Sequence, residues 1–367
     1  MKVLYISSII NSGGVAKIVK MMAQKCCMSY EDFEADIVCC ERPNKETQKE
    51  MSRYNIGFLV IDRILRNPFA YTAKIKKIIK NGHYDAIHSN IEYLNWIPCR
   101  IGKKCGIKYR VGHAHGQHGR SNTFFFHVME AIGRRLNCKY TTTRFACSIA
   151  SGEYVFGKDN FIFLPNFIDY NNIEIIDNIK KEAYSKEFNI VNQKKVGFMG
   201  YLGYEKNPFF TVKLARYCSK NNEDLVFIVA GDGIEKERLI SESAKEIQKG
   251  FIKFIGYRTD NIPLLQFFDV LIMPSFSEGM SMALLEAQIC GTPCVVSNGV
   301  PITNDLHMGL FFQAKSNNAR EWVYLIKKAI NNKYEMTFNE RLDILSKIGY
   351  DSDSIVKKII DSYKGLK

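Results

Sequence analysis

The chain has 367 residues, 46% of them hydrophobic, which is enough for two domains that each bury a core. No window of about 18 apolar residues occurs, and this argues against a membrane-spanning helix. The net charge of +13 favours an anionic partner such as a membrane, a phosphorylated lipid or a nucleic acid, although a solvated basic surface would look the same. Eleven scattered cysteines without a CxxC pair argue against a disulfide framework or a metal cluster and indicate reduced, cytosolic thiols.

Short apolar runs alternate with amphipathic segments along most of the chain. Strands are predicted at KVLYISS, ADIVCC, FLVI, DAIHS, YRVGH, RFACS, KVGFMG, LVFIVAG, FIKFIG, VLIMPS and CVVS. Helices are predicted in the ranges 14–28, 68–80, 92–105, 207–220, 234–248 and 281–290. Continuous apolar strands that alternate with helices form parallel sheets covered on both faces, so the sequence predicts an α/β fold. The run KVLYISS is interpreted as a buried strand rather than a signal sequence, because no small-residue cleavage site follows it.

The alternation fades near residues 170–190, where the sequence is polar and poor in core residues. We therefore predict two doubly wound domains of similar size, residues 1–168 and 191–348, joined by a linker at 169–190. Residues 349–367 are predicted to form a C-terminal helix that crosses back to the N-terminal domain. Ligands bind beyond the carboxyl ends of the strands in open parallel sheets, so the two domains would face a cleft lined by those ends.

The stretch SFSEGMSMALLEAQICGTPCVV places two carboxylates, Glu278 and Glu286, around a predicted helix start. Gly279 permits close backbone approach in the turn, Ser281 is the expected N-cap, and Gly291 ends the helix. Free N–H groups at a helix start favour phosphate, and Glu286 lies about 7.5 Å along the axis, about the reach of a diphosphate. Glu278 would then accept hydrogen bonds from a sugar and Glu286 from both ribose hydroxyls.

These two carboxylates also allow two other interpretations. A glutamate just inside a helix is usually a solvated surface residue. A glutamate pair is also typical of glycoside hydrolases, but Glu286 lies on a helix flank beside a phosphate-binding end rather than across a scissile bond.

The block EGMSMALLEA resembles the signature of the retaining glycosyltransferases of family 4, which carry Glu, seven residues and Glu in the setting E-G-x-x-x-x-x-x-E-A. That family has the GT-B fold, with two Rossmann-like domains facing a cleft, and the resemblance extends along nearly the whole chain. It implies that Glu278 is catalytic. It also implies that the donor is bound by Gly279, Met280, Ser281 and Glu286.

Two segments of the first half also resemble the family. YISSIINSGGVAKIV is similar to its glycine-pair loop, where Gly13 and Gly14 would let the backbone approach the donor diphosphate. In YRVGHAHGQ, His115 aligns with a catalytic histidine that faces the donor sugar, and His113 is the alternative. HAH alone would also suit a metal pair or structural polar residues. Metal is disfavoured because no carboxylate or cysteine cluster joins it.

In the second half, VGFMGYLGYEKNPF resembles the donor-phosphate loop, and Lys206 matches the family's catalytic lysine. Tyr201 occupies the place of an arginine, which is the main departure from the family pattern. FIGYRTD would place Arg258 near the base. The segment PNFID at 165–169 is similar to the family's hinge sequence P-N-G-I-D.

The resemblance implies transfer of a hexosyl or N-acetylhexosaminyl group from a nucleotide sugar, with UDP as the expected nucleotide. The acceptor would be a saccharide linked to a lipid diphosphate in bacterial capsule, exopolysaccharide or lipopolysaccharide biosynthesis. Stabilisation of the departing diphosphate by Lys206, helix N–H groups and the glycine loop would need no metal or other cofactor. DSD at 351–353 is interpreted as a helix cap rather than a metal site.

Competing functions are a GT-B sugar-nucleotide epimerase and, because of Tyr201, a non-catalytic GT-B partner protein. A dinucleotide oxidoreductase is disfavoured because no GxGxxG follows the first strand with an acid about 20 residues later. Residues 100–144 hold ten basic residues against Glu130, and the ring cluster 124–126 follows Arg120. We therefore expect a cytoplasmic protein that associates peripherally with an anionic membrane, unless the rings fill the domain's own core.

Overall fold

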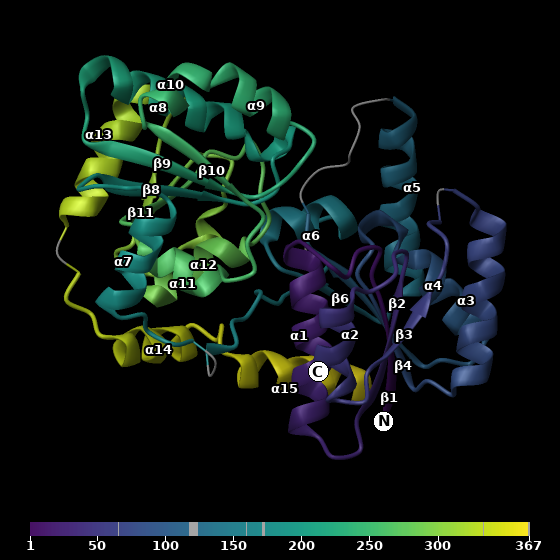
Figure 1. The fold of residues 1–367 in the computed structure, drawn as a ribbon. Coiled ribbons are helices and arrows are strands. Elements are labelled where there is room, and N and C mark those ends of the chain that lie inside the picture. The colour runs from purple at the N-terminus through teal and green to yellow at the C-terminus, as the bar shows by residue number, and fades with distance from the viewer. Residues whose placement is uncertain (65, 117–123, 159, 171–172, 333, 366–367) are drawn as a thin grey trace. The chain divides into compact units, whose positions relative to one another are not determined.

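The computed structural model describes residues 1–367 with the exception of 65, 117–123, 159, 171–172, 333 and 366–367. The chain forms two compact units, one made of residues 1–167 with 349–367 and the other of residues 168–348. Each unit contains one parallel sheet flanked by helices (Figure 1). The predicted α/β class is confirmed, and every run predicted as a strand forms one.

The first unit is built on a seven-stranded sheet with the order β3-β2-β1-β4-β5-β6-β7. Its strands are β1 (Lys2–Ile6), β2 (Glu34–Cys39), β3 (Gly57–Val60), β4 (Ala86–Ser89), β5 (Tyr109–Ala114), β6 (Thr143–Ala146) and β7 (Ile162–Phe163). Its helices are α1 (Gly14–Ser29), α2 (Lys45–Ser52), α3 (Pro68–Gly82), η1 (Glu92–Leu94), α4 (Trp96–Lys104), α5 (Phe124–Tyr140), α6 (Ile149–Phe156) and α15 (Ser352–Lys364).

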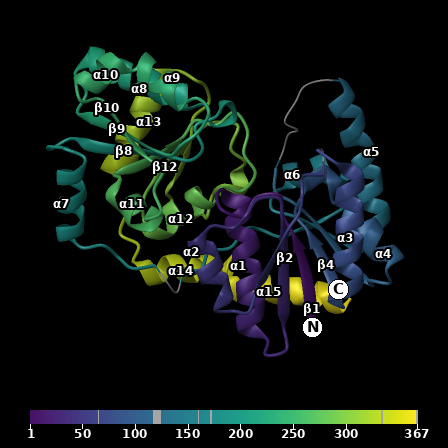
Figure 2. The ribbon, with the colours of Figure 1, turned by 45° about the vertical axis from the view of Figure 1, so that its right-hand side comes forward.

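Side chains on the two faces of this sheet pack against different helices, because successive strand residues point to opposite faces. Leu4 and Ile6 of β1 pack into an apolar cluster with residues of α3 and α4. Tyr5, between them, contacts Cys26 of α1 and Tyr363 of α15 instead. The last helix therefore belongs to the first unit, and Figure 2 shows α15 in yellow beside α1.

Asp351 explains where α15 begins. Its side chain accepts a hydrogen bond from the Ser354 N–H at 2.9 Å, which satisfies one of the unpaired donors of the first helical turn. The DSD sequence is thus a helix cap, as predicted.

The second unit has a six-stranded sheet with the order β10-β9-β8-β11-β12-β13. Its strands are β8 (Lys194–Met199), β9 (Leu225–Ala230), β10 (Ile252–Gly256), β11 (Val270–Met273), β12 (Cys294–Val296) and β13 (Phe311–Gln313). Its helices are α7 (Asn178–Glu187), η3 (Tyr204–Lys206), α8 (Pro208–Asn221), α9 (Lys236–Glu242), α10 (Ala244–Gln248), α11 (Asn261–Phe267), α12 (Met282–Cys290), η4 (Ile302–Asn304), α13 (Ala319–Asn331) and α14 (Phe338–Lys347).

The predicted linker at 169–190 is wrong for its second half, because α7 is part of the second unit. Tyr184, Phe188 and Ile190 are buried in the apolar cluster that also contains residues of β9, β11, α11 and α12. Tyr184 stacks on Phe188 with 5.7 Å between ring centroids, and its hydroxyl donates to Asp260 at 2.7 Å. The polar residues that suggested a linker are the solvent-facing side of an amphipathic helix.

Truncation of Tyr184 tests this packing. Tyr184→Ala should lower the free energy of unfolding by about 3 kcal/mol, because a buried aromatic ring is removed from a filled core. Ile179→Ala, on the same helix but 76% exposed, is the matched control and should change it by less than about 0.5 kcal/mol. Urea unfolding of both variants gives the comparison, and equal effects would restore the linker interpretation.

Candidate functional site

The carboxyl ends of β8 and β11 bring Lys206 and Glu278 into contact. The two strands are hydrogen-bonded neighbours in the parallel sheet, so their following loops emerge side by side. The Lys206 ammonium forms an ion pair with Glu278 Oε1, and the same oxygen accepts from Ser275 Oγ at 2.7 Å. The Lys206 side chain is 27% exposed and that of Glu278 10%. Two of the residues predicted to be catalytic thus form one half-buried cluster.

Backbone contacts hold these two loops together. The Phe276 N–H donates to the Glu205 carbonyl at 2.8 Å, and the Asn207 amide donates to the Pro274 carbonyl at 3.1 Å. The rings of Tyr204 and Phe276 lie 5.1 Å apart. The positions of Lys206 and Glu278 are therefore fixed by several contacts besides their own ion pair.

The start of α12 is capped by a residue that the sequence did not reveal. Ser281 occupies the N-cap position as predicted, but its side chain makes no cap hydrogen bond. The side chain of Asn304 in η4 makes the hydrogen bonds at this helix start instead. Its Oδ1 accepts from the Ser281 N–H at 2.7 Å, and its Nδ2 donates to the Gly279 carbonyl at 2.9 Å. Gly291 ends α12 in the left-handed region, as predicted.

Met280 and Glu286 are both buried, and the side chain of Glu286 is not the solvated surface residue that its position in a helix would favour. Glu286 is the fifth residue of α12. It comes from the same helix whose first turn follows Glu278 and Gly279. The spacing of the two carboxylates is thus set by one rigid helix.

The loop after β8 packs tightly against the loop after β9. Gly231 has φ +154°, and a Cβ there would lie 1.9 Å from the Gly200 carbonyl oxygen. The Leu202 N–H donates to the Asp232 carbonyl at 2.9 Å. The glycine at this position of the AGDG segment is therefore needed for loop packing.

Tyr201, at the place of the family's arginine, is 60% exposed.

Arg258 is held by carboxylates. Its Nε and one terminal nitrogen donate to Asp260 at 2.8 and 2.7 Å, and its other terminal nitrogen donates to Glu187 of α7 at 2.7 Å. The guanidinium lowers the pKa of Asp260 to about 2. In the structure Arg258 ties α7 to the loop after β10, and its contact with a donor base stays a prediction.

In the first unit, Gly13 and Gly14 lie at the start of α1. Gly13 is the N-cap residue and has φ +89°, a conformation that L-residues rarely adopt. Glu41, which follows β2, accepts from the N–H groups of Ile10 and Asn11 at 2.7 and 2.8 Å. The glycine loop is exposed and is positioned by this carboxylate.

His113 and His115 lie at the end of β5, with ring centroids 4.2 Å apart. His88, which the sequence motifs did not place in the site, lies on the neighbouring strand β4, and its Nε2 is 3.2 Å from His113 Nδ1. Burial lowers the pKa of His88 and of His115 to about 3, and that of His113 well below its ordinary value. All three imidazoles are therefore neutral at physiological pH.

Glu92 is a further site residue that sequence reasoning missed. One of its carboxylate oxygens accepts from the N–H groups of His115 and Gly116 at 3.1 and 3.2 Å, so it fixes the turn that carries His115. Its φ of +58° is unusual for a glutamate. Burial raises its pKa to about 7, and the two amide hydrogen bonds oppose this shift. The sequence signal that could have identified Glu92 is its position two residues after DAIHSN, the run that contains a predicted strand.

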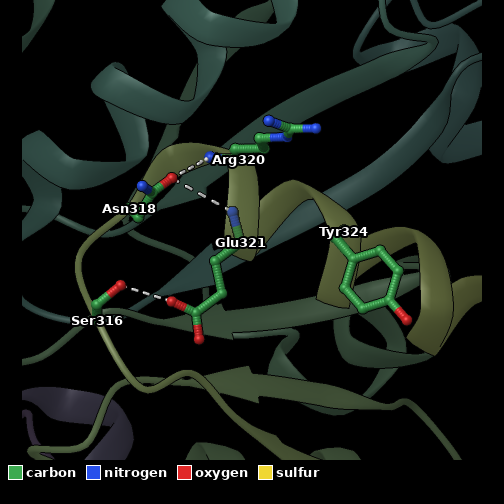
Figure 3. A pocket seen from close by; sticks show the side chains of 5 residues that line it. All are labelled: Ser316, Asn318, Arg320, Glu321 and Tyr324. Carbon is green, nitrogen blue, oxygen red and sulfur yellow. Dashed lines mark hydrogen bonds between the residues drawn. The ribbon is translucent and has the colours of Figure 1, made fainter.

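A surface hollow of about 370 Å³ lies at the start of α13 (Figure 3). Asn318 Oδ1 accepts from the Arg320 N–H at 2.9 Å, and Glu321 accepts from Ser316 Oγ at 2.6 Å. These polar groups serve the helix cap, so the hollow is not a candidate site.

Within the described residues, no group of three or more His, Cys, Asp or Glu side chains could hold a metal ion. All eleven cysteines are free thiols. None of the helices in the described ranges combines the length and the hydrophobicity that a membrane span requires.

Comparisons with known proteins agree on one class. The Anabaena HepE structure, solved in complex with UDP, superposes with a TM-score of 0.81 at 17% identity over 100% of both chains, which shows the GT-B fold. The Bacillus subtilis protein called putative glycosyltransferase EpsF is 24% identical over 99% of this chain and 96% of its own. An Escherichia coli enzyme, UDP-Gal:alpha-D-GlcNAc-diphosphoundecaprenol alpha-1,3-galactosyltransferase, is 27% identical over 60% of each chain.

Two family models match the two halves. The model described as Glycosyltransferase Family 4 matches residues 12–171, and that described as Glycosyl transferases group 1 matches residues 180–349. Together they span most of the chain. The protein therefore belongs to the family 4 glycosyltransferases with the GT-B fold, as the EGMSMALLEA block predicted.

The pKa of Glu92 predicts how its replacement changes stability with pH. A carboxyl with a raised native pKa favours folding most below its unfolded value of about 4.3, and this contribution is lost as pH rises through 7. Glu92→Gln keeps an acceptor oxygen for both amides and stays neutral. Its unfolding free energy, relative to wild type, should therefore rise between pH 5 and pH 8.

Urea unfolding at the two pH values measures this difference, and contributions from the histidines cancel because both proteins contain them. Glu153→Gln, altered at an exposed glutamate of α6, is the control. A pH-dependent difference no larger than that of the control would contradict the assignment.

Proposed function

We propose that the protein is a retaining glycosyltransferase that moves a hexosyl or N-acetylhexosaminyl group from a UDP-sugar to a saccharide acceptor linked to a lipid diphosphate. The biological process would be the synthesis of a bacterial surface polysaccharide. The carrying observation is the contact between Lys206, Glu278 and Ser275 at the carboxyl ends of two neighbouring strands, directly before α12. In a family 4 glycosyltransferase this is a place where a cation, hydroxyl acceptors and helix N–H groups meet.

Each part of the donor has a partner of matching chemistry in the second unit. Lys206 and the α12 N-terminus would neutralise the diphosphate, and Glu286 would accept from the ribose hydroxyls. Glu278 would accept from hydroxyls of the sugar. The ion pair between Lys206 and Glu278 would open when the donor binds, because the diphosphate competes for the ammonium and the sugar hydroxyls replace it at the carboxylate.

The relatives support the donor and acceptor classes. The name of the Escherichia coli relative specifies UDP-Gal as donor and a diphosphoundecaprenol-linked GlcNAc as acceptor, and HepE was solved with UDP. A net charge of +13 suits a protein whose two substrates both carry diphosphates.

The proposed chemistry is a front-face displacement. The bond between the sugar C1 and the phosphate oxygen breaks, and the acceptor hydroxyl oxygen bonds to C1 on the same face. The departing phosphate takes the hydroxyl proton. The scheme requires no protein nucleophile and no metal, and its barrier is lowered by stabilising the negative charge of the leaving UDP. His115 is the proposed contact to the donor sugar.

Tyr201 would contribute a phenolic donor where the family has an arginine. Losing one charge-assisted contact costs a few kcal/mol at most, so we expect an active but slower enzyme. An epimerase would release an altered nucleotide sugar, and a non-catalytic partner would bind a donor without consuming it.

Lys206→Ala tests the proposed phosphate contact. With Tyr201 in place of a cation, Lys206 carries most of the side-chain charge on the diphosphate, so turnover should fall about 100-fold or more. The measurement is release of UDP from a panel of UDP- and GDP-sugars, with and without a lipid-diphosphate-linked acceptor.

Lys195→Ala is the matched control, because Lys195 also bridges β8 and the start of β11 through its ion pair with Asp269 at 2.9 Å. Lys195 lies at the amino ends of these strands, away from Lys206, so Lys195→Ala should leave turnover within about twofold of wild type. Unchanged turnover in Lys206→Ala would refute the phosphate-loop assignment. A wild-type protein that binds a nucleotide sugar but never consumes it would favour the non-catalytic alternative.

We also propose that the first unit associates with an anionic membrane through α4 and α5. Of the ten basic residues in 100–144, Arg110, Arg134 and Arg144 donate to backbone carbonyls and serve the fold. Arg120 and the side chains of Phe124 and Phe125 lie outside the described residues. Six exposed cations remain: Arg100, Lys103, Lys104, Lys108, Arg135 and Lys139.

These cations are accompanied by exposed apolar side chains. Val128 and Ile132 of α5 are 40% and 47% exposed, and they precede Arg135 and Lys139 at helical spacing. A helix face with apolar residues followed by cations suits the boundary between acyl chains and anionic headgroups.

Cosedimentation with vesicles that contain anionic lipid tests the membrane proposal. Arg135→Ala combined with Lys139→Ala should reduce binding several-fold at low salt, and added salt should weaken binding by wild type. Lys76→Ala combined with Lys77→Ala removes two exposed charges from α3 and is the charge-matched control. Equal losses in both double variants would mean that only net charge matters, and no binding at low salt would refute the proposal.

A further inference from the structure

A chain of buried polar side chains runs from the last helix to the histidines of β5. Tyr363 of α15, Tyr5 of β1 and His88 of β4 are each 0% exposed, and His113 is 1% exposed. His88 Nδ1 lies 2.6 Å from the Tyr363 hydroxyl, and His88 Nε2 lies 3.2 Å from His113 Nδ1. Tyr363 of α15 is thus hydrogen-bonded to His88 of β4, and the His88 ring links α15 to His113 of β5.

The two tyrosine hydroxyl groups determine which atoms are the donors in this series of hydrogen bonds. Tyr363 donates to the Tyr5 hydroxyl at 3.0 Å, and Tyr5 donates to Cys26 Sγ at 3.7 Å. With its proton used in this way, the Tyr363 oxygen can only accept from His88. His88 is therefore protonated on Nδ1.

The direction continues into His113. A neutral imidazole carries one proton, so His88 Nε2 is an acceptor and His113 Nδ1 must be the donor to it. Burial keeps both rings neutral, as their lowered pKa values indicate. His113 Nε2 is then left with a lone pair.

His115 also has a ring nitrogen with a free lone pair, because of its hydrogen bond to Asn90. The Asn90 amide nitrogen is 3.4 Å from the Ile6 carbonyl and 3.3 Å from the His88 carbonyl, so it donates to them and its Oδ1 accepts from His115 Nε2 at 2.9 Å. His115 Nδ1 therefore also carries a lone pair. Among the described residues, neither His113 Nε2 nor His115 Nδ1 has a hydrogen-bond partner, although both atoms are buried.

We infer that Tyr363 and His88 are positioning residues that hold His113 in the Nδ1–H tautomer, so that His113 and His115 present two adjacent acceptor nitrogens. A group with hydroxyl hydrogens, such as a sugar, satisfies two such acceptors. A reversed chain would instead present one donor and one acceptor. The link to a sugar ligand rests on the proposed function, whereas the tautomer follows from the contacts alone.

Histidine NMR tests the tautomers directly. The chain has only seven histidines, and long-range proton–nitrogen correlation spectra of the full-length protein with ¹⁵N-labelled histidine distinguish the two neutral tautomers. We expect His88 and His113 to be protonated on Nδ1 and His115 on Nε2. Protonation of His113 on Nε2 would overturn the inference, whatever the protein's activity.

Tyr363→Phe removes the acceptor for His88 Nδ1–H and keeps the ring. The Nδ1–H populations of His88 and His113 should fall relative to Nε2–H by about five-fold, the effect expected for loss of one hydrogen bond. Tyr71→Phe is the matched control, because Tyr71 is buried in the same unit but packs in the apolar cluster on the opposite face of the sheet. Unchanged His113 tautomers in Tyr363→Phe, or equal changes in both variants, would overturn the inference.

Donor turnover provides a separate readout. If the sugar uses both acceptors, Tyr363→Phe should lower kcat/KM for the nucleotide sugar about ten-fold, while Tyr71→Phe leaves it near the wild-type value. A tautomer shift without a loss of kcat/KM would refute the positioning role but leave the proposed transferase activity intact. Absence of any transferase activity in wild type would refute the proposed function, and the NMR result would still decide the tautomer.

Discussion

The adjacency of parallel strands is the constraint on which both candidate clusters depend. β8 and β11 are separated by β9 and β10 along the chain, yet they pair directly, so the loops that follow them emerge together and Lys206 contacts Glu278 across 72 residues of sequence. In the first unit the pairing of β4 with β5 places His88 beside His113. In both cases the sheet brings together groups that could not meet through local structure.

The fold was predictable wherever burial on both faces left a continuous apolar run. Interior strands such as β1, β9 and β11 have this pattern, whereas β7 has two residues and β13 is the short edge strand FFQ, so neither stands out from a loop. The helix α7 was mistaken for a linker because Tyr184 is its one buried residue, and the core residues Phe188 and Ile190 come after its end. A helix that buries so narrow a stripe gives a weak periodic signal.

The placement of the candidate site residues was predictable where they follow strands, as Lys206, Glu278 and His115 do. The residues that support them were not. Asn304 caps α12 from 23 residues away, and Tyr363 contacts His88 across 275 residues, so no local pattern connects them. For Arg258 the family motif predicted a position near the base. The motif did not reveal that the guanidinium is hydrogen-bonded to Asp260 and Glu187. Long-range hydrogen bonds depend on the three-dimensional arrangement, so the spacing of residues along the sequence does not reveal them.

The assignment of α15 to the first unit has a consequence for synthesis on the ribosome. Domains usually fold in the order in which they emerge, N-terminal first. Here the part of the N-terminal sheet that α15 covers, around Tyr5 and His88, stays open until residues 349–367 have been made, after all 181 residues of the second unit. The second unit can therefore complete its core before the first. During translation the nascent chain must keep the face around His88 from aggregating until its own last helix arrives to cover it.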